Sequence, residues 1–352
     1  MGIKSSETVE LFFQDVKVPV ENRLGAEGEG FKVAMNILNN GRFGIPAAMS
    51  GCMRFCIAKT VEHVNTRVQF GRKLKGHRNV QEKLAEMLIK QYVTESITYL
   101  LAANMDRGIT EYQIEAAIGK IVGSESAWWV CDEALQLHGG MGFMREAQLE
   151  RVLRDLRIFR IFEGANDVLR LFVALTGVQH AGAHIREVTD VLQSPLKTSP
   201  KEALGVLGKI YQSVSSSSLH GQVHRSLELP GRMACTALDD FGKAVRTSLL
   251  THKKGIIEQQ NALIRLADAA IDIYSMAATL ARCSRSLSHD APSAQHELMM
   301  TKIFCRQASA RVDTNLTAVT NVQCSKEFAM MTELAEAACE QQGVVQQNPI
   351  GL

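Results

Sequence analysis

The spacing of apolar positions changes near residue 31. Before it, Val9, Leu11 and Phe13 alternate with polar residues, and this pattern predicts a β-strand over residues 8–18. After it, apolar side chains recur at helical spacing. We predict helices near residues 31–61 (interrupted at 41–46), 80–105, 112–137, 146–158 and 167–176. Long helices joined by short loops favour an up-and-down bundle.

A second helical region follows a segment of different composition. Residues 193–222 contain Pro195, Pro200 and four consecutive serines, which is typical of a linker. Within it, residues 197–211 fit either a basic amphipathic helix at a membrane surface or a helix packed on its own protein. Further helices are predicted near residues 231–250, 259–287, 294–320 and 326–342.

Composition excludes several classes of protein. Hydrophobic residues make up 46% and charged residues 22%, which is ordinary for a globular protein and excludes a mainly disordered one. The formal net charge of +2 provides no strong field for nucleic acid, so no nucleic-acid partner is expected. The cysteines occur without a zinc-ligand spacing, so we expect reduced thiols and no metal site.

Three short segments contain candidate chemistry. Glu163 follows Ile161 and Phe162, and Gly164 comes directly after it. A carboxylate with apolar neighbours such as Ile161 and Phe162 fits a general base. A carboxylate that caps a helix fits the same residues. The Gly-rich segment 136–143 and the segment Arg67-Val-Gln-Phe-Gly71 are each weak signals for ligand binding when taken alone.

Together these segments resemble one family, the acyl-CoA dehydrogenases. Four motifs agree with it in order and spacing. They are Gly30-Phe-Lys-Val-Ala-Met35, Arg67-x-Gln-Phe-Gly71, Gln136-x-x-Gly-Gly-x-Gly-Phe143, and Arg154-Asp followed by Ile161-Phe-Glu-Gly164. The second helical region is similar to the C-terminal extension of the very-long-chain branch, through Lys253-Lys-Gly-Ile256 and Arg265-Leu-Ala-Asp268. The resemblance covers essentially the whole chain.

The resemblance implies a mainly α fold. It predicts the C-terminal four-helix up-and-down bundle of acyl-CoA dehydrogenases, followed by a second helical domain, with a short β remnant at the N-terminus. The expected domains are 1–24, a remnant of the middle β-domain; 25–180, the bundle; 181–228, the linker; and 229–352, the second helical domain. The family's N-terminal helical domain and most of its β-domain are expected to be lacking.

The resemblance also assigns roles to substrate-binding and catalytic residues. Glu163 matches the catalytic base, which removes the α-proton of an acyl-CoA thioester while the β-hydrogen leaves as hydride to the flavin. The backbone N–H of the same glutamate donates a hydrogen bond to the thioester carbonyl in this family. Gly164 matches a residue that lies against the substrate, and Asn39 and Arg42 match the segment that contacts it.

The cofactor implied by the resemblance is FAD. Arg67 and Phe70 match contacts to the flavin's ADP portion across a homodimer interface. The expected FAD contacts of the Gly-rich segment are Gln136, Leu137, His138, Gly139 and Gly140. Asn166 and Asp167 match the turn that faces FAD, whereas Ala165 replaces the family's usual threonine.

The function implied is FAD-dependent α,β-dehydrogenation of long- or very-long-chain acyl-CoA in mitochondrial fatty-acid β-oxidation. Electron-transfer flavoprotein is the expected electron acceptor. The expected location is the matrix side of the inner membrane, with a peripheral membrane contact through residues 197–211 as one alternative. Two other interpretations stay open: a non-catalytic assembly or interaction protein of the respiratory-chain type, and an inactive truncated product.

Overall fold

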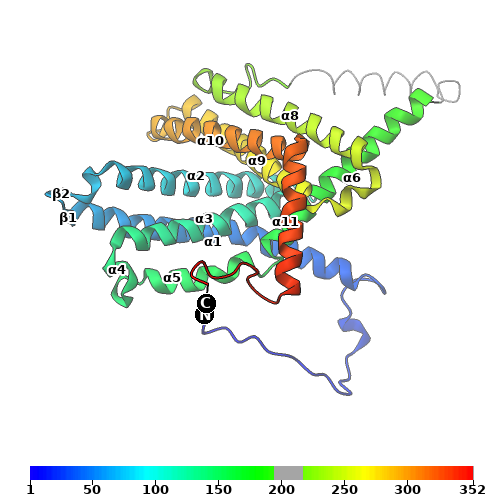
Figure 1. Cartoon of the computed structure of the whole chain (residues 1–352), viewed down its shortest axis with the longest axis horizontal. Coiled ribbons are helices and arrows are strands. Elements are labelled where there is room, and N and C mark those ends of the chain that lie inside the picture. The colour runs from blue at the N-terminus through cyan, green and yellow to red at the C-terminus, as the bar shows by residue number, and fades with distance from the viewer. Residues whose placement is uncertain (194–216, 352) are drawn as a thin grey trace. The chain divides into compact units, whose positions relative to one another are not determined.

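The computed structural model describes residues 1–193 and 217–351, except the side chains of Asn39 and residues 180–193. Helices dominate it, as the sequence predicted (Figure 1). They are α1 (Gly30–Thr66), α2 (Arg78–Asp106), α3 (Gln113–His138), α4 (Gly140–Phe143), α5 (Leu149–Leu156), α6 (Asn166–Gln193), α8 (Glu228–His252), α9 (Gln260–Ser288), α10 (Ala294–Thr320) and α11 (Val322–Glu340). Short 3₁₀-helices occupy Val20–Asn22, Leu74–Gly76, Arg145–Ala147, Arg157–Arg160, Arg225–Leu227 and Lys253–Glu258. Strands β1 (Val68–Gln69) and β2 (Arg72–Lys73) form an antiparallel hairpin.

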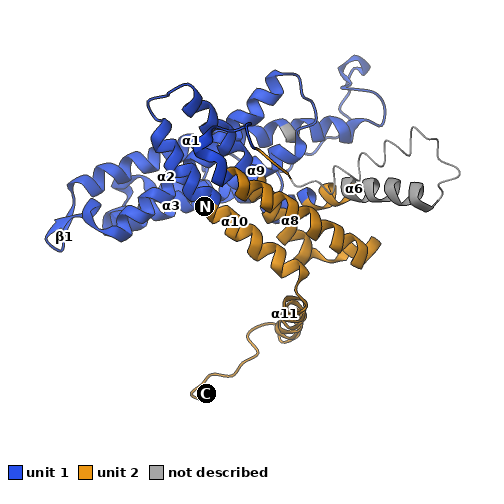
Figure 2. Cartoon of the chain, turned by 90° about the horizontal axis from the view of Figure 1, so that it is seen from above, with its two compact units in different colours: residues 1–173, 220–230, 274–305 blue, residues 174–219, 231–273, 306–352 orange. Residues whose placement is uncertain are grey.

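The chain forms two compact units (Figure 2). Unit 1 comprises residues 1–173, 220–230 and 274–305, and unit 2 comprises residues 174–219, 231–273 and 306–352. Helices α9 and α10 therefore each contribute residues to both units.

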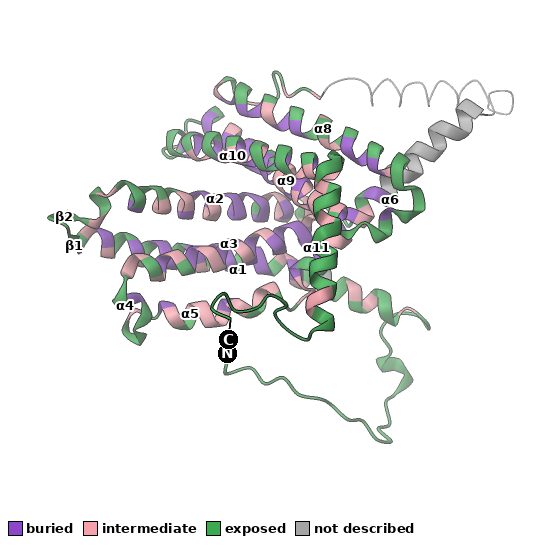
Figure 3. Ribbon diagram, viewed as in Figure 1, coloured by how far each residue is buried: buried purple, intermediate pink, exposed green. Residues whose placement is uncertain are grey.

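The core of unit 1 lies between α1, α2, α3 and α5. Apolar side chains from all four helices are buried there (Figure 3). Fully buried members include Met53, Cys56, Met87, Val130, Cys131 and Leu149. Burial of this kind of surface contributes about 25 cal/mol for each Å² removed from water, so the amphipathic pattern along these helices stabilises the bundle.

Helices α1 and α3 approach each other closely at Pro46. A Cβ atom on Gly123 would lie 2.9 Å from the Cα atom of Pro46, and one on Gly119 would lie 3.3 Å from its Cγ atom. The proline does not interrupt the helix, because α1 runs continuously from Gly30 to Thr66. The break predicted at residues 41–46 was therefore wrong: the proline ring packs into the space that the two glycines leave.

A buried polar cluster joins α2 to the segment 274–305 within unit 1. The Arg282 guanidinium donates to Glu95 at 2.8 Å and lies over the Tyr92 ring, 4.3 Å from its centroid. The Tyr92 hydroxyl donates to the Glu297 carboxylate at 3.0 Å. Buried charged groups of this kind hold a fixed arrangement because each is costly to leave without a partner.

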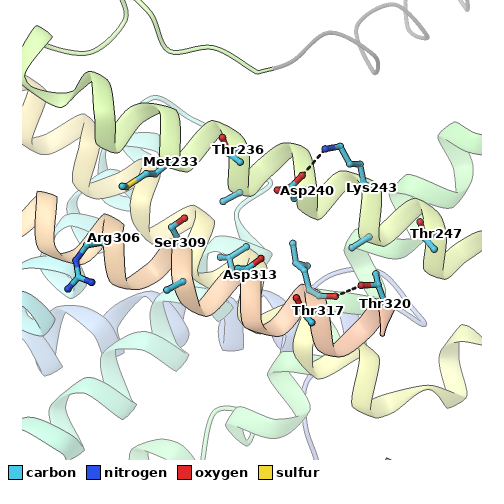
Figure 4. A pocket seen from close by; sticks show the side chains of 15 residues that line it. Met233, Thr236, Asp240, Lys243, Thr247, Arg306, Ser309, Asp313, Thr317 and Thr320 are labelled. Carbon is cyan, nitrogen blue, oxygen red and sulfur yellow. Dashed lines mark hydrogen bonds and ion pairs between the residues drawn. The ribbon is translucent and has the colours of Figure 1, made fainter. Parts of the chain in front are cut away.

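Unit 2 has its own core and a surface groove. Ala237, Val245, Leu266, Ala269 and Val312 are buried where α8, α9 and α10 pack together. A groove of about 620 Å³ runs between α8 and α10, and the core residues Ala237 and Val312 are part of its lining (Figure 4). Its rim includes an ion pair between Lys243 and Asp240 at 2.7 Å. The site residues predicted from the sequence do not line this groove.

The strand predicted over residues 8–18 is wrong. That segment has no regular secondary structure, and the Phe12 and Phe13 side chains are 88% and 78% exposed. A segment with alternating apolar side chains forms a strand only when its backbone pairs with that of a neighbouring strand. Residues 8–18 have no such partner in the described part of the chain. The possible amphipathic helix at 197–211 lies outside the described residues, and among those described no helix is long and apolar enough to cross a membrane.

We predict that Gly123→Ala destabilises unit 1 by about 1–3 kcal/mol, because the new methyl group must displace the backbone of α1 at Pro46. Unfolding in urea can be followed by the fluorescence of Trp128 and Trp129, which both lie on α3. Gly51→Ala is the matched control, since nothing lies within 4 Å of that Cβ position. It should stabilise by up to about 1 kcal/mol. Equal effects of the two variants would contradict the close packing.

Candidate functional site

The candidate site is built on a turn between the 3₁₀-helix Arg157–Arg160 and α6. Glu163 has a φ of 58° and Gly164 a φ of 89°, so two consecutive residues adopt left-handed backbone conformations. For a residue with a side chain such a conformation costs about 1–3 kcal/mol, and it persists only where the surroundings hold it. At Gly164 an added Cβ would also lie 3.1 Å from Leu169.

Two buried cations donate hydrogen bonds to this turn. Arg42 of α1 donates from Nε to the carbonyl oxygen of Glu163 at 3.2 Å. Lys120 of α3 donates from Nζ to the carbonyl oxygen of Gly164 at 2.8 Å. Arg42 is 6% exposed and Lys120 is fully buried. Consecutive peptide planes are thus fixed from two different helices.

The Glu163 carboxylate lies against the backbone of α1 at Gly41. A Cβ atom on Gly41 would be 2.8 Å from both carboxylate oxygens, so only glycine leaves room for them. Oxygen Oε2 is buried and has no hydrogen-bond partner within the described part of the chain. The prediction that Ile161 and Phe162 give the Glu163 carboxylate an apolar surround is wrong. Those two side chains are 48% and 37% exposed, and the charge of Arg42 acts on Glu163.

Asn166 connects the turn to α3. Its side-chain oxygen accepts from Lys120 at 2.7 Å, and its amide donates to Ser124 at 3.1 Å and to Glu125 at 2.9 Å. Arg170 of α6 binds both carboxylate oxygens of Glu125, at 2.8 and 2.9 Å. The Asn166 side chain is therefore bound to α3, whereas Asp167 is exposed in the first turn of α6.

The pKa values of Lys120, Arg42 and Glu125 in this cluster are lower than those of the free side chains. Burial, and then the charge of Arg42, lower the pKa of Lys120 to about 8, although Glu125 and Glu163 oppose the shift. Burial lowers the pKa of Arg42 against the opposing charge of Glu163. Burial raises the pKa of Glu125, but the hydrogen bonds and charge of Arg170 outweigh it, so this pKa lies below its ordinary value.

A second cluster forms where α1 and α3 end. Arg67 follows α1 directly, and Phe70 lies at the tip of the β1–β2 hairpin with a φ of 51° and 93% exposure. The rings of His63 and His138 stack with centroids 4.4 Å apart, which brings the ends of the two helices together. The side chain of His138 also contacts the Ala134 carbonyl oxygen, 2.7 Å from Nδ1.

The rest of the predicted Gly-rich segment belongs to this second cluster. Gln136, Gly139 and Gly140 are exposed there, and Leu137 and His138 are half-buried. Gly139 has a φ of 59° and ends α3 before the short helix α4 begins. Backbone N–H groups at such a glycine turn are suited to an anionic ligand.

The predicted site residues therefore fall into two groups. Arg42 and His63 both lie on the continuous helix α1, and a rise of 1.5 Å per residue separates them by about 30 Å along the helix. Glu163, Gly164 and Asn166 belong to the first group, and Arg67, Phe70 and residues 136–140 to the second. Asn39 lies on α1 one turn before Arg42, and its side chain is outside the described part of the structure.

Sequence reasoning missed three members of the first group: Lys120, Gly41 and Glu125. A signal for Lys120 was present, because a charged residue interrupts the otherwise apolar face of residues 114–122. A lysine at such a position is seldom fully buried unless a partner holds it. Nothing in the sequence pattern pointed to Gly41, since its role depends on where the Glu163 carboxylate lies in three dimensions.

Comparison with known proteins extends over both helical regions. The family model described as "Acyl-CoA dehydrogenase, C-terminal domain" matches residues 28–176, and "ACAD9/ACADV, C-terminal domain" matches residues 225–344. The "Very long-chain specific acyl-CoA dehydrogenase, mitochondrial" of Homo sapiens is 50% identical over 100% of this chain. The chain belongs to the acyl-CoA dehydrogenase family. It spans about half the length of the curated relatives it matches, covering 54% of the human one.

Other members of the acyl-CoA dehydrogenase family agree with this assignment. The relative from Bos taurus is likewise 50% identical, and a "Probable acyl-CoA dehydrogenase" of Bacillus subtilis is 30% identical over 90% of this chain and 54% of its own length. Among solved structures, the acyl-CoA dehydrogenase complexed with FAD from Bacillus anthracis has a TM-score of 0.72 at 25% identity. That match covers 96% of this chain and 57% of the bacterial one.

We predict that Arg170→Met lowers the free energy of unfolding of unit 1 by about 2 kcal/mol at pH 7, because Glu125 loses a charged partner. The pKa of Glu125 is lowered in the folded state, so its stabilising effect is present above pH 4.5 and disappears as pH falls through the folded value. The difference between wild type and variant, measured by urea unfolding, should therefore shrink on acidification. Arg151→Met, which removes an exposed ion pair, should change stability by under about 1 kcal/mol. A pH-independent difference for Arg170→Met would contradict the prediction.

Proposed function

We propose that this chain provides the catalytic-base part of an FAD-dependent acyl-CoA dehydrogenase that acts on long acyl thioesters. The observation that carries the proposal is the half-buried Glu163, which lies on a turn held by Arg42 and Lys120 and has one carboxylate oxygen, Oε2, without a hydrogen-bond partner in the described structure. A general base needs a fixed position and a carboxylate that is not fully occupied by other hydrogen bonds.

In this mechanism the Glu163 carboxylate takes the α-proton of the thioester. The backbone N–H of Glu163 donates to the thioester carbonyl and stabilises the negative charge that develops there. Arg42 and Lys120 keep both groups in place by holding the adjacent carbonyls. FAD, when bound, would accept the β-hydrogen as hydride.

The second cluster fits the dinucleotide part of FAD. The guanidinium of Arg67 is exposed, and a Cβ atom on Gly139 or Gly140 would meet nothing within 4 Å, so a ligand can approach the backbone there. Because the two clusters lie about 30 Å apart along α1, we assign them to different flavins. Arg67, Phe70 and residues 136–140 then serve the Glu163 site of a second copy in a homodimer.

The relatives indicate the substrate and the cellular location. Those from Homo sapiens and Bos taurus are named as very long-chain specific and mitochondrial, so we propose long acyl-CoA as substrate and mitochondria as location. The solved structure from Bacillus anthracis contains FAD, which supports the same cofactor here. Electron-transfer flavoprotein as acceptor and a matrix-side contact with the inner membrane follow from the family resemblance and are part of the proposal.

A non-catalytic interaction protein is the second candidate function. The exposed apolar side chains of Val9, Leu11, Phe12 and Phe13 favour it, because a contiguous apolar segment is suited to binding another protein. The two candidates differ in flavin binding: an interaction protein has no need to retain FAD, whereas a dehydrogenase must.

We predict that the 352-residue chain binds FAD and that long-chain acyl-CoA bleaches its visible absorption band. Glu163→Gln should keep the flavin and lower the bleaching rate by a factor of about 10²–10⁴, because the amide cannot accept the α-proton. Glu146→Gln, an exposed substitution of the same kind, should bleach like wild type. Failure of the wild-type chain to bind FAD, or rapid bleaching by Glu163→Gln, would overturn the proposed function.

We predict that two inactive variants complement each other if the clusters belong to different copies of one site. Coexpression of Glu163→Gln and Arg67→Ala chains should restore about a quarter of wild-type activity, since half of the dimers are mixed and each mixed dimer has one intact site. Each variant expressed alone provides the baseline. Activity that does not exceed this baseline would place Arg67 and Glu163 in the same-chain site or rule out the dimer.

A further inference from the structure

We propose that Lys120 is a positioning residue for the Glu163 base, because its buried ammonium group holds the left-handed turn from inside α3. This inference deepens the proposed function and depends on it for its catalytic meaning. The hydrogen bonds of Lys120 go to the Gly164 carbonyl and to Asn166 and not to the Glu163 carboxylate, so it acts through the backbone and through Asn166.

The burial of Lys120 is the first observation in support. The residue is fully buried in the first half of α3, where a charge is costly unless partners bind it. Its ammonium donates to the Gly164 carbonyl at 2.8 Å and to Asn166 at 2.7 Å. Both acceptors belong to the turn and to the start of α6, and neither belongs to the core of the bundle. The ammonium charge of Lys120 therefore binds the turn that contains Glu163.

The geometry of the turn is the second observation. The backbone angles of Gly164 lie between two peptide planes, and each plane has one carbonyl bound to a buried cation. Arg42 fixes the plane that begins at Glu163, and Lys120 fixes the next one. Loss of either donor leaves the angles of Gly164 free to change. Because Glu163 is adjacent and itself has a positive φ, its side chain moves with them.

The charge of Lys120 provides a way to separate positioning from packing. Its pKa is lowered to about 8, and the groups that face it are Arg42 of α1, Glu125 of α3 and Glu163 of the turn. A charged donor makes hydrogen bonds about twice as strong as a neutral one. The hydrogen bonds from Lys120 to the turn therefore weaken as pH rises through 8. An arginine at this position stays charged, so its hydrogen bonds would not weaken in this range.

The test compares Lys120→Met, Lys120→Arg and a control, Lys83→Met, which removes a different ion pair of the same bundle, between Lys83 and Glu133. Amide hydrogen exchange of residues 161–167 is measured on the chain without flavin. Lys120→Met should exchange there at least about tenfold faster than wild type, whereas Lys83→Met should not. If Lys120→Met does not fold, exchange of residues 161–167 is compared between pH 7 and pH 9.5 in wild type and Lys120→Arg, after correction for intrinsic exchange rates. Only wild type should lose protection at the higher pH, and equal behaviour of the two would overturn the inference.

Flavin bleaching by long-chain acyl-CoA is then followed from pH 7 to 9.5. Lys120→Met should lower the maximal bleaching rate, with little change in the acyl-CoA concentration that gives half of that rate. Lys120→Arg should have much of the wild-type rate. It should also lack the decrease in rate that wild type shows above pH 8. Wild-type exchange and bleaching in Lys120→Met would overturn the inference while leaving the proposed function intact. If wild type does not bleach at all, the proposed function fails, and hydrogen exchange still decides whether Lys120 holds the turn.

Discussion

The candidate site depends on two buried cations that bind consecutive carbonyl oxygens of one turn. Left-handed backbone at Glu163 is unfavourable by itself, and the hydrogen bonds from Arg42 and Lys120 offset that cost. Since the cations come from α1 and α3, the position of the carboxylate is set by how these two helices pack. A change in that packing would change the site without touching any residue that contacts a ligand.

The close approach of α1 and α3 provides this packing. Pro46 lies one turn after Arg42, and Gly119 and Gly123 are close to Lys120 in α3, so this close contact of the two helices is adjacent to the site. Small residues at that contact allow the backbones to come near enough for both cations to reach the turn. The same glycines therefore serve stability and, on the proposed function, catalysis.

On the proposed function, the two clusters of predicted site residues belong to two different active sites. Glu163 is bound by Arg42 in the first half of α1. Arg67 and the Gly-rich segment lie near the end of the same helix, about 30 Å further along it. The proposed dimer resolves this separation by letting each copy contribute one cluster to each site. The stacked pair of His63 and His138 has a structural role in that arrangement, since it joins the helix ends that carry the second cluster.

Helical periodicity by itself determined most of the fold. The helix predicted over residues 294–320 has those bounds, and α2 and α3 differ from their predicted ranges by a residue or two, because burial on one helix face leaves a periodic record in the sequence. Motifs also predicted Glu163 as a catalytic base and Arg42 as a substrate contact, and the structure places the two residues together. Only the tertiary structure decided that residues 8–18 form no strand, that Lys120 faces inward to the turn, and that Gly41 makes room for the carboxylate. Each of these depends on which distant backbone lies alongside, and a one-dimensional pattern does not encode that neighbour.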